Sequence, residues 1–224
     1  MPVYLYLMLF TLSFPLVLSF DNNVQFVKKW KYFFPAVLLP ITVFLVWDYL
    51  FTLWGVWGFN SDYLLGYYFL NLPVEEISFF IVVPFACIFI YECLNYYIKK
   101  DILKPYEAHI SLTLLLLFFL VGFLNIERLY TSVNFISAGI FLAIIYFIIK
   151  PKYLSRFYFA YLVVLVPFAL VNGILTYLPV VWYNDAENLG IRLVSIPVED
   201  LVYNFSKLLS YTVMYERLKQ RNTN

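Results

Sequence analysis

The sequence predicts an all-α fold: a polytopic membrane helix bundle of about seven transmembrane helices, arranged as two parallel three-helix repeats joined by one extra helix. Three observations support this prediction. The composition is 63% hydrophobic and only 13% charged, with a mean hydropathy of +0.81, which lies outside the range of soluble globular domains. Apolar runs of membrane-spanning length recur along the chain, and the sequence matches itself at a fixed offset.

Seven apolar runs can be drawn along the 224 residues. Most approach the ~20 residues that a helix needs to cross about 30 Å of hydrocarbon, so they predict helical spans and not barrel strands. The first run has no basic segment before it and no small-residue cleavage site after it, and we expect it to be a retained span. The runs cover residues 2–20, 33–54, 74–98, 109–125, 133–149, 157–178 and 197–216.

The basic residues predict the orientation of these spans. Of the 15 Lys and Arg residues, twelve fall on one side of the seven spans, only Arg128 and Arg192 fall on the other, and Lys207 lies inside the last run. Cytoplasmic loops carry the excess of Lys and Arg. We therefore expect a multi-pass protein of the cell membrane with its N-terminus outside and its C-terminus in the cytoplasm. The net charge of +1 gives no reason to expect a nucleic-acid partner.

An internal repeat emerges when the chain is shifted against itself by 124 residues, the separation of Pro73 and Pro197. Apolar coincidences are common in such a composition, but coincident polar residues and glycines are not. Equivalent spans lie four crossings apart, so both copies should face the same way about a pseudo-twofold axis along the membrane normal. We expect a first repeat at 1–98, a connecting transmembrane helix at 99–128 and a second repeat at 129–224. The informative matches are Asn60 with Asn184, Gly66 with Gly190, Glu75 with Glu199 and Glu92 with Glu216.

The repeat contains a proline followed by paired acids, once after Pro73 and once after Pro197. Acidic side chains at the mouth of a membrane-length helix are expensive to bury and therefore suggest a function, although an acid in a first helical turn can also be a solvated cap. Asp48 lies at a similar depth near the outer end of the second span, and its counterpart in the repeat is Asn172. The candidate catalytic residues are Glu75, Glu76, Glu199, Asp200 and Asp48.

Paired carboxyl groups indicate acid catalysis. Adjacent acids on a helix point about 100° apart, so one can face the bundle while the other holds it in place. Two close carboxyl groups resist simultaneous ionisation, which supplies a protonated acid at neutral pH. Aromatic residues make up 22% of the chain. Most belong to packing and to the interfacial belt, but those near the acids could stabilise a carbocation through their ring faces.

The sequence predicts neither a metal site nor a cofactor. Cys87 and Cys93 lie in one span, His109 is the single histidine, and no Gly-rich phosphate-binding loop is present. Lys207 lies near the middle of the last run, where a charged side chain needs a partner. Asp200, two helical turns earlier, is the expected ion-pair partner, and a retinal Schiff base on Lys207 is the alternative.

Four segments of the first copy follow one another in a pattern: Trp47–Thr52, Gly55–Phe59, Leu72–Glu76 and Phe79–Phe80. This pattern resembles the integral-membrane lycopene cyclase family, in the form that fuses the two subunits of the heterodimeric bacterial enzyme, and the resemblance covers essentially the whole chain. The second copy departs from it through Asn172 and Asp200, which replace Asp48 and Glu76. The residues expected to bind substrate are Trp47, Phe51, Trp54, Trp57, Phe79, Phe80, Asn172 and Tyr203.

The resemblance implies a carotenoid lycopene cyclase that converts lycopene to β-carotene via γ-carotene by acid-catalysed, cofactor-independent isomerisation. Glu75 or Glu76 would donate the proton, with Glu199 and Asp200 as the matching pair and Asp48 tuning them. The expected partners are a hydrophobic carotenoid substrate, membrane lipids and other carotenoid-pathway enzymes. The alternatives from other classes are a membrane transporter built from parallel repeats and a retinal- or carotenoid-binding heptahelical protein. Within enzymes, a carotenoid hydratase or a cyclase that makes another ring type stays open.

Overall fold

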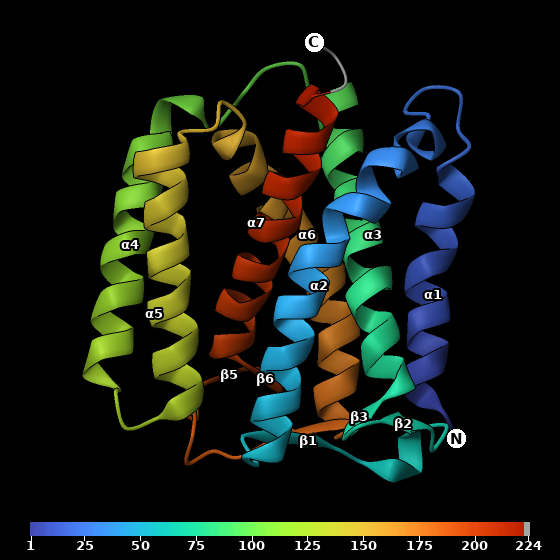
Figure 1. Ribbon diagram of the computed structural model, residues 1–224, viewed down its shortest axis with the longest axis vertical. Coiled ribbons are helices and arrows are strands. Elements are labelled where there is room, and N and C mark those ends of the chain that lie inside the picture. The colour runs from blue at the N-terminus through green and yellow to red at the C-terminus, as the bar shows by residue number, and fades with distance from the viewer. Residues whose placement is uncertain (222–224) are drawn as a thin grey trace.

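Residues 1–221, the part of the chain that the computed structural model describes, form seven α-helices (Figure 1). Successive helices run in alternating directions, so α1 begins at one end of the bundle and α7 ends at the other. The prediction of an all-α bundle of about seven helices is confirmed. The helices are α1 (Val3–Leu18), α2 (Trp30–Leu53), α3 (Val74–Tyr97), α4 (Glu107–Leu124), α5 (Leu129–Ala143), α6 (Leu154–Tyr177) and α7 (Val198–Arg221), with short helical turns η1 (Phe26–Lys29), η2 (Ser61–Tyr63), η3 (Lys104–Tyr106) and the π-helical η4 (Ile144–Ile149).

Five helical segments within the described part are long and apolar enough to cross a membrane: α2 with η1, α3, α4 with η3, α5 with η4, and α6. α1 is apolar but has only 16 residues. α7 has 24 residues and carries Asp200, Asn204 and Lys207, all of which are buried. α7 packs against α2 and α5 in the middle of the bundle (Figure 1). Its polar side chains therefore face protein, as polar groups inside a membrane must.

The two repeats have matching element bounds. α6 and α7 begin and end 124 residues after α2 and α3, whereas α5 begins 126 residues after α1. Leu70 and Val194, which are also 124 residues apart, both adopt the left-handed backbone region, with φ of 56° and 61°. The predicted pair of parallel three-helix repeats, joined by α4 as the extra helix, is confirmed.

Short strands gather at the end of the bundle where α3 and α7 begin (Figure 1). β1 (Trp57–Phe59) and β4 (Val181–Tyr183) pair antiparallel, and Gly58 lies opposite Trp182, its own repeat counterpart. The pseudo-twofold axis therefore passes through this residue pair. A Cβ atom on Gly58 would lie 2.4 Å from Cζ2 of Trp182, so only glycine fits. Two hairpins lead into α3 and α7: β2 (Tyr68–Phe69) with β3 (Leu72–Pro73), and β5 (Arg192–Leu193) with β6 (Ile196–Pro197).

The repeats also exchange hydrogen bonds at the opposite end of α3 and α7. The Tyr91 hydroxyl donates to Glu216 over 3.1 Å, and the equivalent Tyr215 hydroxyl donates to Glu92 over 2.8 Å. Glu92 is additionally paired with Lys219 at 2.6 Å. α3 and α7 are thus joined to each other across the pseudo-twofold axis by the same tyrosine–glutamate hydrogen bond, which occurs twice.

α4 has no repeat counterpart and packs against α5 at the edge of the bundle (Figure 1). It contributes Phe118 to the main hydrophobic core, where the ring centroids of Phe135 and Phe205 lie 6.0 and 5.6 Å away. α4 also carries the chain back to the end of the bundle that holds the strands. The second repeat consequently starts at the same end as the first, which places both acid motifs together.

Candidate active site

The paired acids lie in the first turns of α3 and α7, and all of them are buried. The exposed fractions are 1% for Glu75, 7% for Glu76, 0% for Glu199 and 6% for Asp200. Asp48 on α2 is 3% exposed. A carboxylate that only caps a helix at the membrane surface would stay in contact with water. The geometry therefore excludes solvated caps.

The first acid of each pair holds the preceding loop against its helix. Oε1 of Glu75 accepts a hydrogen bond of 2.6 Å from the backbone N–H of Leu65. Oε1 of Glu199 accepts the equivalent bond of 2.7 Å from Leu189, and a further bond of 2.7 Å from the hydroxyl of Thr131. These two glutamates fix the approach of the chain to α3 and α7, so their role in the fold is positional.

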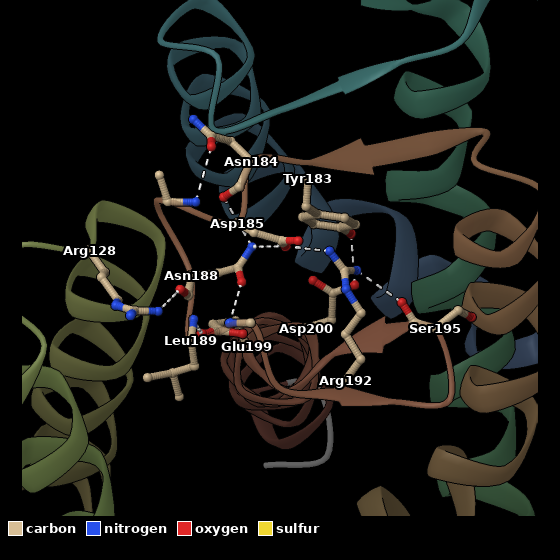
Figure 2. Close-up of polar contacts among 12 residues, drawn as sticks. Arg128, Tyr183, Asn184, Asp185, Asn188, Leu189, Arg192, Ser195, Glu199 and Asp200 are labelled. Atoms are coloured by element: carbon tan, nitrogen blue, oxygen red, sulfur yellow. Dashed lines mark hydrogen bonds and ion pairs between the residues drawn. The ribbon is translucent and has the colours of Figure 1, made fainter.

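Polar contacts order the loop of the second repeat (Figure 2). Arg192 forms an ion pair of 2.5 Å with Asp185, whose carboxylate also accepts a bond of 3.3 Å from the Asn188 side chain. Arg128, just before α5, donates to the backbone carbonyl of Asn188. The loop is therefore tied both to itself and to α5, which keeps the N–H of Leu189 directed at Glu199.

The second acid of each pair faces inward and accepts a hydrogen bond from a tyrosine. The Tyr4 hydroxyl of α1 donates to Oε2 of Glu76 over 2.5 Å. In the second repeat, the Tyr130 hydroxyl of α5 donates to Oδ1 of Asp200 over 2.6 Å. The first helix of each repeat thus supplies the donor that orients the acid on the third helix.

The middle helix of each repeat supplies a second partner, and here the repeats differ. In the first repeat the buried carboxyl groups of Asp48 and Glu76 line the same cavity and lie beside each other. In the second repeat Nδ2 of Asn172 donates to Oδ2 of Asp200 over 2.7 Å. Two adjacent buried carboxyl groups resist simultaneous ionisation, whereas an acid beside an amide meets no such repulsion. The two halves of the site are therefore chemically different.

Two more tyrosines complete the acid cluster. The Tyr203 hydroxyl of α7 donates to Oδ1 of Asp48 over 2.6 Å, and the Tyr183 hydroxyl of β4 donates to Oδ2 of Asp200 over 2.7 Å. Burial first, and then the adjacent Asp200, raise the pKa of Tyr183 well above its usual range. Tyr183 consequently stays protonated and remains a donor to Asp200.

These side chains surround one cavity of about 60 Å³ on the pseudo-twofold axis, not two separate sites. The cavity is bounded by the acids of both repeats and by aromatic rings. Lys207 also reaches it, with Nζ 4.1 Å from the ring centroid of Phe79. Among residues 1–221, no three His, Cys, Asp or Glu side chains are grouped so that they could hold a metal ion. The lining comprises Tyr4, Asp48, Trp57, Phe59, Glu76, Phe79, Tyr130, Phe168, Asn172, Leu175, Val181, Tyr183, Asp200, Tyr203, Asn204 and Lys207.

The sequence matches the protein family described as lycopene cyclase over residues 2–94 and 127–218. The chain belongs to the lycopene cyclase family. No curated protein and no solved structure gives a significant match. Membership of the lycopene cyclase family supports a carotenoid cyclase function and, together with the apolar helices, makes this a membrane protein.

The site of this lycopene cyclase family member contains three of the five predicted catalytic residues: Asp48, Glu76 and Asp200 line the cavity. Glu75 and Glu199 lie one residue earlier and point to the loops instead. The separation follows from the helix, because adjacent side chains point about 100° apart.

The predicted substrate-binding residues divide in the same way. Trp57, Phe79, Asn172 and Tyr203 line the cavity. Behind them, the rings of Trp47 and Phe51 pack against this lining, at 5.6 Å from Tyr203 and 5.0 Å from Trp57. Trp54 is 56% exposed and Phe80 is buried outside the lining, so the structure does not bring either ring to the cavity.

Sequence reasoning missed several residues of the site, among them Tyr4, Tyr130 and Asn204. Tyr4 and Tyr130 are equivalent, but they lie 126 residues apart and an ungapped shift of 124 does not align them. Asn204 lines the cavity, and neither Nδ2 nor Oδ1 of its side chain has a hydrogen-bond partner among the described residues. A self-comparison that allowed a gap before α2 could have found the tyrosines; Asn204 gives no such signal, because its counterpart is Phe80.

The expected ion pair between Lys207 and Asp200 needs correction. Among the ion pairs of residues 1–221, none joins Lys207 to Asp200. The reason is geometric: Asp200 is turned toward Tyr130 and Tyr183, which already satisfy it. Lys207 instead lines the same cavity as Asp48 and Glu76.

Proposed function

We propose that this protein is a lycopene cyclase that closes the linear ends of lycopene into β rings without a cofactor, giving β-carotene via γ-carotene. The observation that carries the proposal is the pair of buried carboxyl groups of Asp48 and Glu76, which line one aromatic cavity. The family match supports the reaction class. The isomerisation requires an acid, a base and the exclusion of water, and the cavity offers candidates for each.

In this proposal the pair of Asp48 and Glu76 is the proton donor. Its shared proton is transferred to the terminal double bond of the substrate, which leaves a tertiary carbocation. The hydroxyls of Tyr4 and Tyr203 already donate to these two acids. They continue to stabilise the negative charge that appears when the proton leaves, without any rearrangement.

Asp200 serves as the counter-ion and base. The neighbouring double bond attacks the cation, a carbon–carbon bond closes the ring, and the new cation loses a proton from an adjacent carbon to Asp200. Return of that proton to the carboxyl pair restores the enzyme, so the reaction has no net redox change. The ionised form of Asp200 is favoured by three donors, from Tyr130, Tyr183 and Asn172. The rings around the cavity can stabilise the intermediate cation through their faces.

We also propose that the end of the bundle with the strands faces outward and the C-terminus is cytoplasmic. The support is the loop charge: only Arg128 and Arg192 lie at the strand end, against twelve basic residues at the other. Two separate fusions to the C-terminus test this orientation, one with a reporter that is active only in the periplasm and one with a reporter that is active only in the cytoplasm. Only the second fusion should be active.

Expression in a host that accumulates lycopene, followed by chromatography of the pigments, tests the cyclase. The wild-type protein should convert lycopene to cyclic carotenes. Glu76→Gln and Asp48→Asn should each leave lycopene, because an amide cannot take part in the shared-proton pair. Glu127→Gln is the matched control, because Glu127 is exposed in the turn between α4 and α5 and its variant should behave like wild type. Full cyclisation by Glu76→Gln would refute the proposed donor.

A further inference from the structure

An apolar groove lies between α1, α3 and α6, with a volume of about 260 Å³. Phe10 and Phe14 of α1 border it and are largely exposed on the face of the bundle. Cys87 of α3 and Val171 of α6 line its interior. In a membrane protein, an apolar groove that opens at this level faces the hydrocarbon of the bilayer.

This groove, the α1–α3–α6 groove, adjoins the acid cavity. Phe79, Phe168, Asn172 and Asn204 line both spaces. Asn172 donates to Asp200, and the side-chain amide of Asn204 has no hydrogen-bond partner among residues 1–221. The shared side chains are therefore all that lies between the apolar groove and the carboxyl groups of the cavity.

The pseudo-twofold axis relates this groove to the region between α5, α7 and α2, where two of the equivalent positions carry larger side chains. The residue equivalent to Val171 is Trp47, whose indole packs at 5.6 Å from the Tyr203 ring. The residue equivalent to Cys87 is Tyr211, which is fully buried. Val171 and Cys87 are thus two lining positions at which the groove has a smaller residue than the equivalent region.

We propose that the α1–α3–α6 groove admits the linear polyene chain of the substrate, and that Val171 and Cys87 keep this one path open. The inference rests on the proposed cyclase function and extends it. Its occupant is a long, uncharged polyene, because the groove wall is apolar up to the junction and the acids lie only at its inner end. The terminal double bond can then reach the cavity while the rest of the chain stays in the groove and the adjoining lipid.

The single path determines how the two ends of a symmetric carotenoid are treated. One end reaches the acids at a time, since Trp47 and Tyr211 occupy the equivalent path. The monocyclic product must leave the groove and return with its other end first. A monocyclic carotene should therefore appear as a free intermediate before the bicyclic product.

Bulky substitutions in the groove test the proposal in the lycopene-accumulating host. Val171→Trp and Cys87→Tyr introduce the residues of the equivalent region, and each should lower cyclisation by about a hundredfold, because the reacting end no longer reaches the acids. Val166→Trp is the matched control, because Val166 lies on the same helix but is 67% exposed; it should cyclise like wild type. Wild-type cyclisation by both groove variants would overturn the proposal.

The two proposals fail in different ways. If the wild-type protein gives no cyclic carotene, the proposed function is wrong; if wild type and both groove variants all cyclise, only the groove assignment is wrong. Size-exclusion chromatography in detergent checks that the variants fold. If neither groove variant folds, thiol labelling provides a second test. In the double variant Cys93→Ser, Glu76→Gln, bound lycopene should slow the reaction of Cys87 with N-ethylmaleimide. An unchanged labelling rate would overturn the proposal.

Discussion

Asp48 and Asn172 occupy equivalent positions in the two repeats, yet Asp48 places a second carboxyl group beside Glu76 whereas Asn172 donates an N–H to Asp200 over 2.7 Å. In the proposed mechanism this one chemical difference divides a pseudo-symmetric site into an acidic half and a basic half. Acid–base catalysis requires one carboxyl group that is protonated and another that is ionised.

Replacing Asp48 by asparagine, the residue at the equivalent position 172, should remove the difference between the acidic and the basic half. Asp48→Asn makes the first half resemble the second, and we expect cyclisation to fall by about a hundredfold or more, since general acid catalysis contributes that much. Pigment chromatography in the lycopene-accumulating host measures the loss. The reciprocal variant Asn172→Asp keeps the donor pair and should retain more activity than Asp48→Asn. Equal activities of the two variants would contradict the division of roles.

The tyrosines of α1 and α5 should matter for reaction rate more than for folding. Tyr4→Phe removes one hydrogen bond to Glu76, and Tyr130→Phe removes the equivalent bond to Asp200. Hydrogen bonds to charged groups contribute about 1.5–3 kcal/mol, so each variant should slow cyclisation by about ten- to a hundredfold. Tyr6→Phe, on the exposed face of α1, is the control. Initial rates with lycopene in detergent give the comparison, and a wild-type rate for Tyr4→Phe would count against its role as a donor.

Adjacent glutamates on α3 should give different mutant behaviour. Glu75→Ala removes the acceptor of the Leu65 N–H and should lower the free energy of unfolding by about 1–3 kcal/mol, because a buried donor loses its partner. Glu76→Gln should leave the melting temperature in detergent near that of wild type and remove cyclisation. Thermal unfolding and pigment analysis of both variants separate the two roles. A stable Glu75→Ala protein would show that the loop is held by other contacts.

The strand pair on the pseudo-twofold axis should not tolerate a side chain at Gly58. A Cβ atom there meets the Trp182 ring at 2.4 Å, and Gly58→Ala should destabilise the fold by about 1–3 kcal/mol, as overpacking does. Trp182→Leu removes the clashing ring and should restore most of the melting temperature of the Gly58→Ala protein. Additive losses in the double variant would mean that the two residues do not meet.

Tyr183 should make stability depend on alkaline pH. Its folded-state pKa is raised by burial and by Asp200, so the folded protein keeps a proton that the unfolded chain releases near its ordinary pKa of about 10. The contribution is complete below that pH and decreases as pH rises above it. Between pH 9 and 11, the melting temperature of Tyr183→Phe should fall less steeply than that of wild type. Parallel pH curves would contradict this.

The sequence predicts the bundle, the repeat and the acid motifs because these features depend on local hydropathy and on a constant spacing. It cannot distinguish Glu75 from Glu76, because the direction of each carboxyl group depends on how α3 is rotated against its neighbours. It also gives each repeat an acid pair without showing that the chain packs α2, α3, α6 and α7 around a single cavity. The donors Tyr4 and Tyr130 stay hidden because the spacing before α2 and α6 differs by two residues.

The crossed bonds from Tyr91 to Glu216 and from Tyr215 to Glu92 have the form of an isologous contact, in which the same patch is used by both sides. A single ancestral repeat that associated with an identical copy would have made both bonds. Fusion through α4 then required no new interface, only a helix that returns the chain to its starting side. Once the halves were one gene, position 48 and position 172 were free to diverge, which a homodimer of identical subunits could not have done.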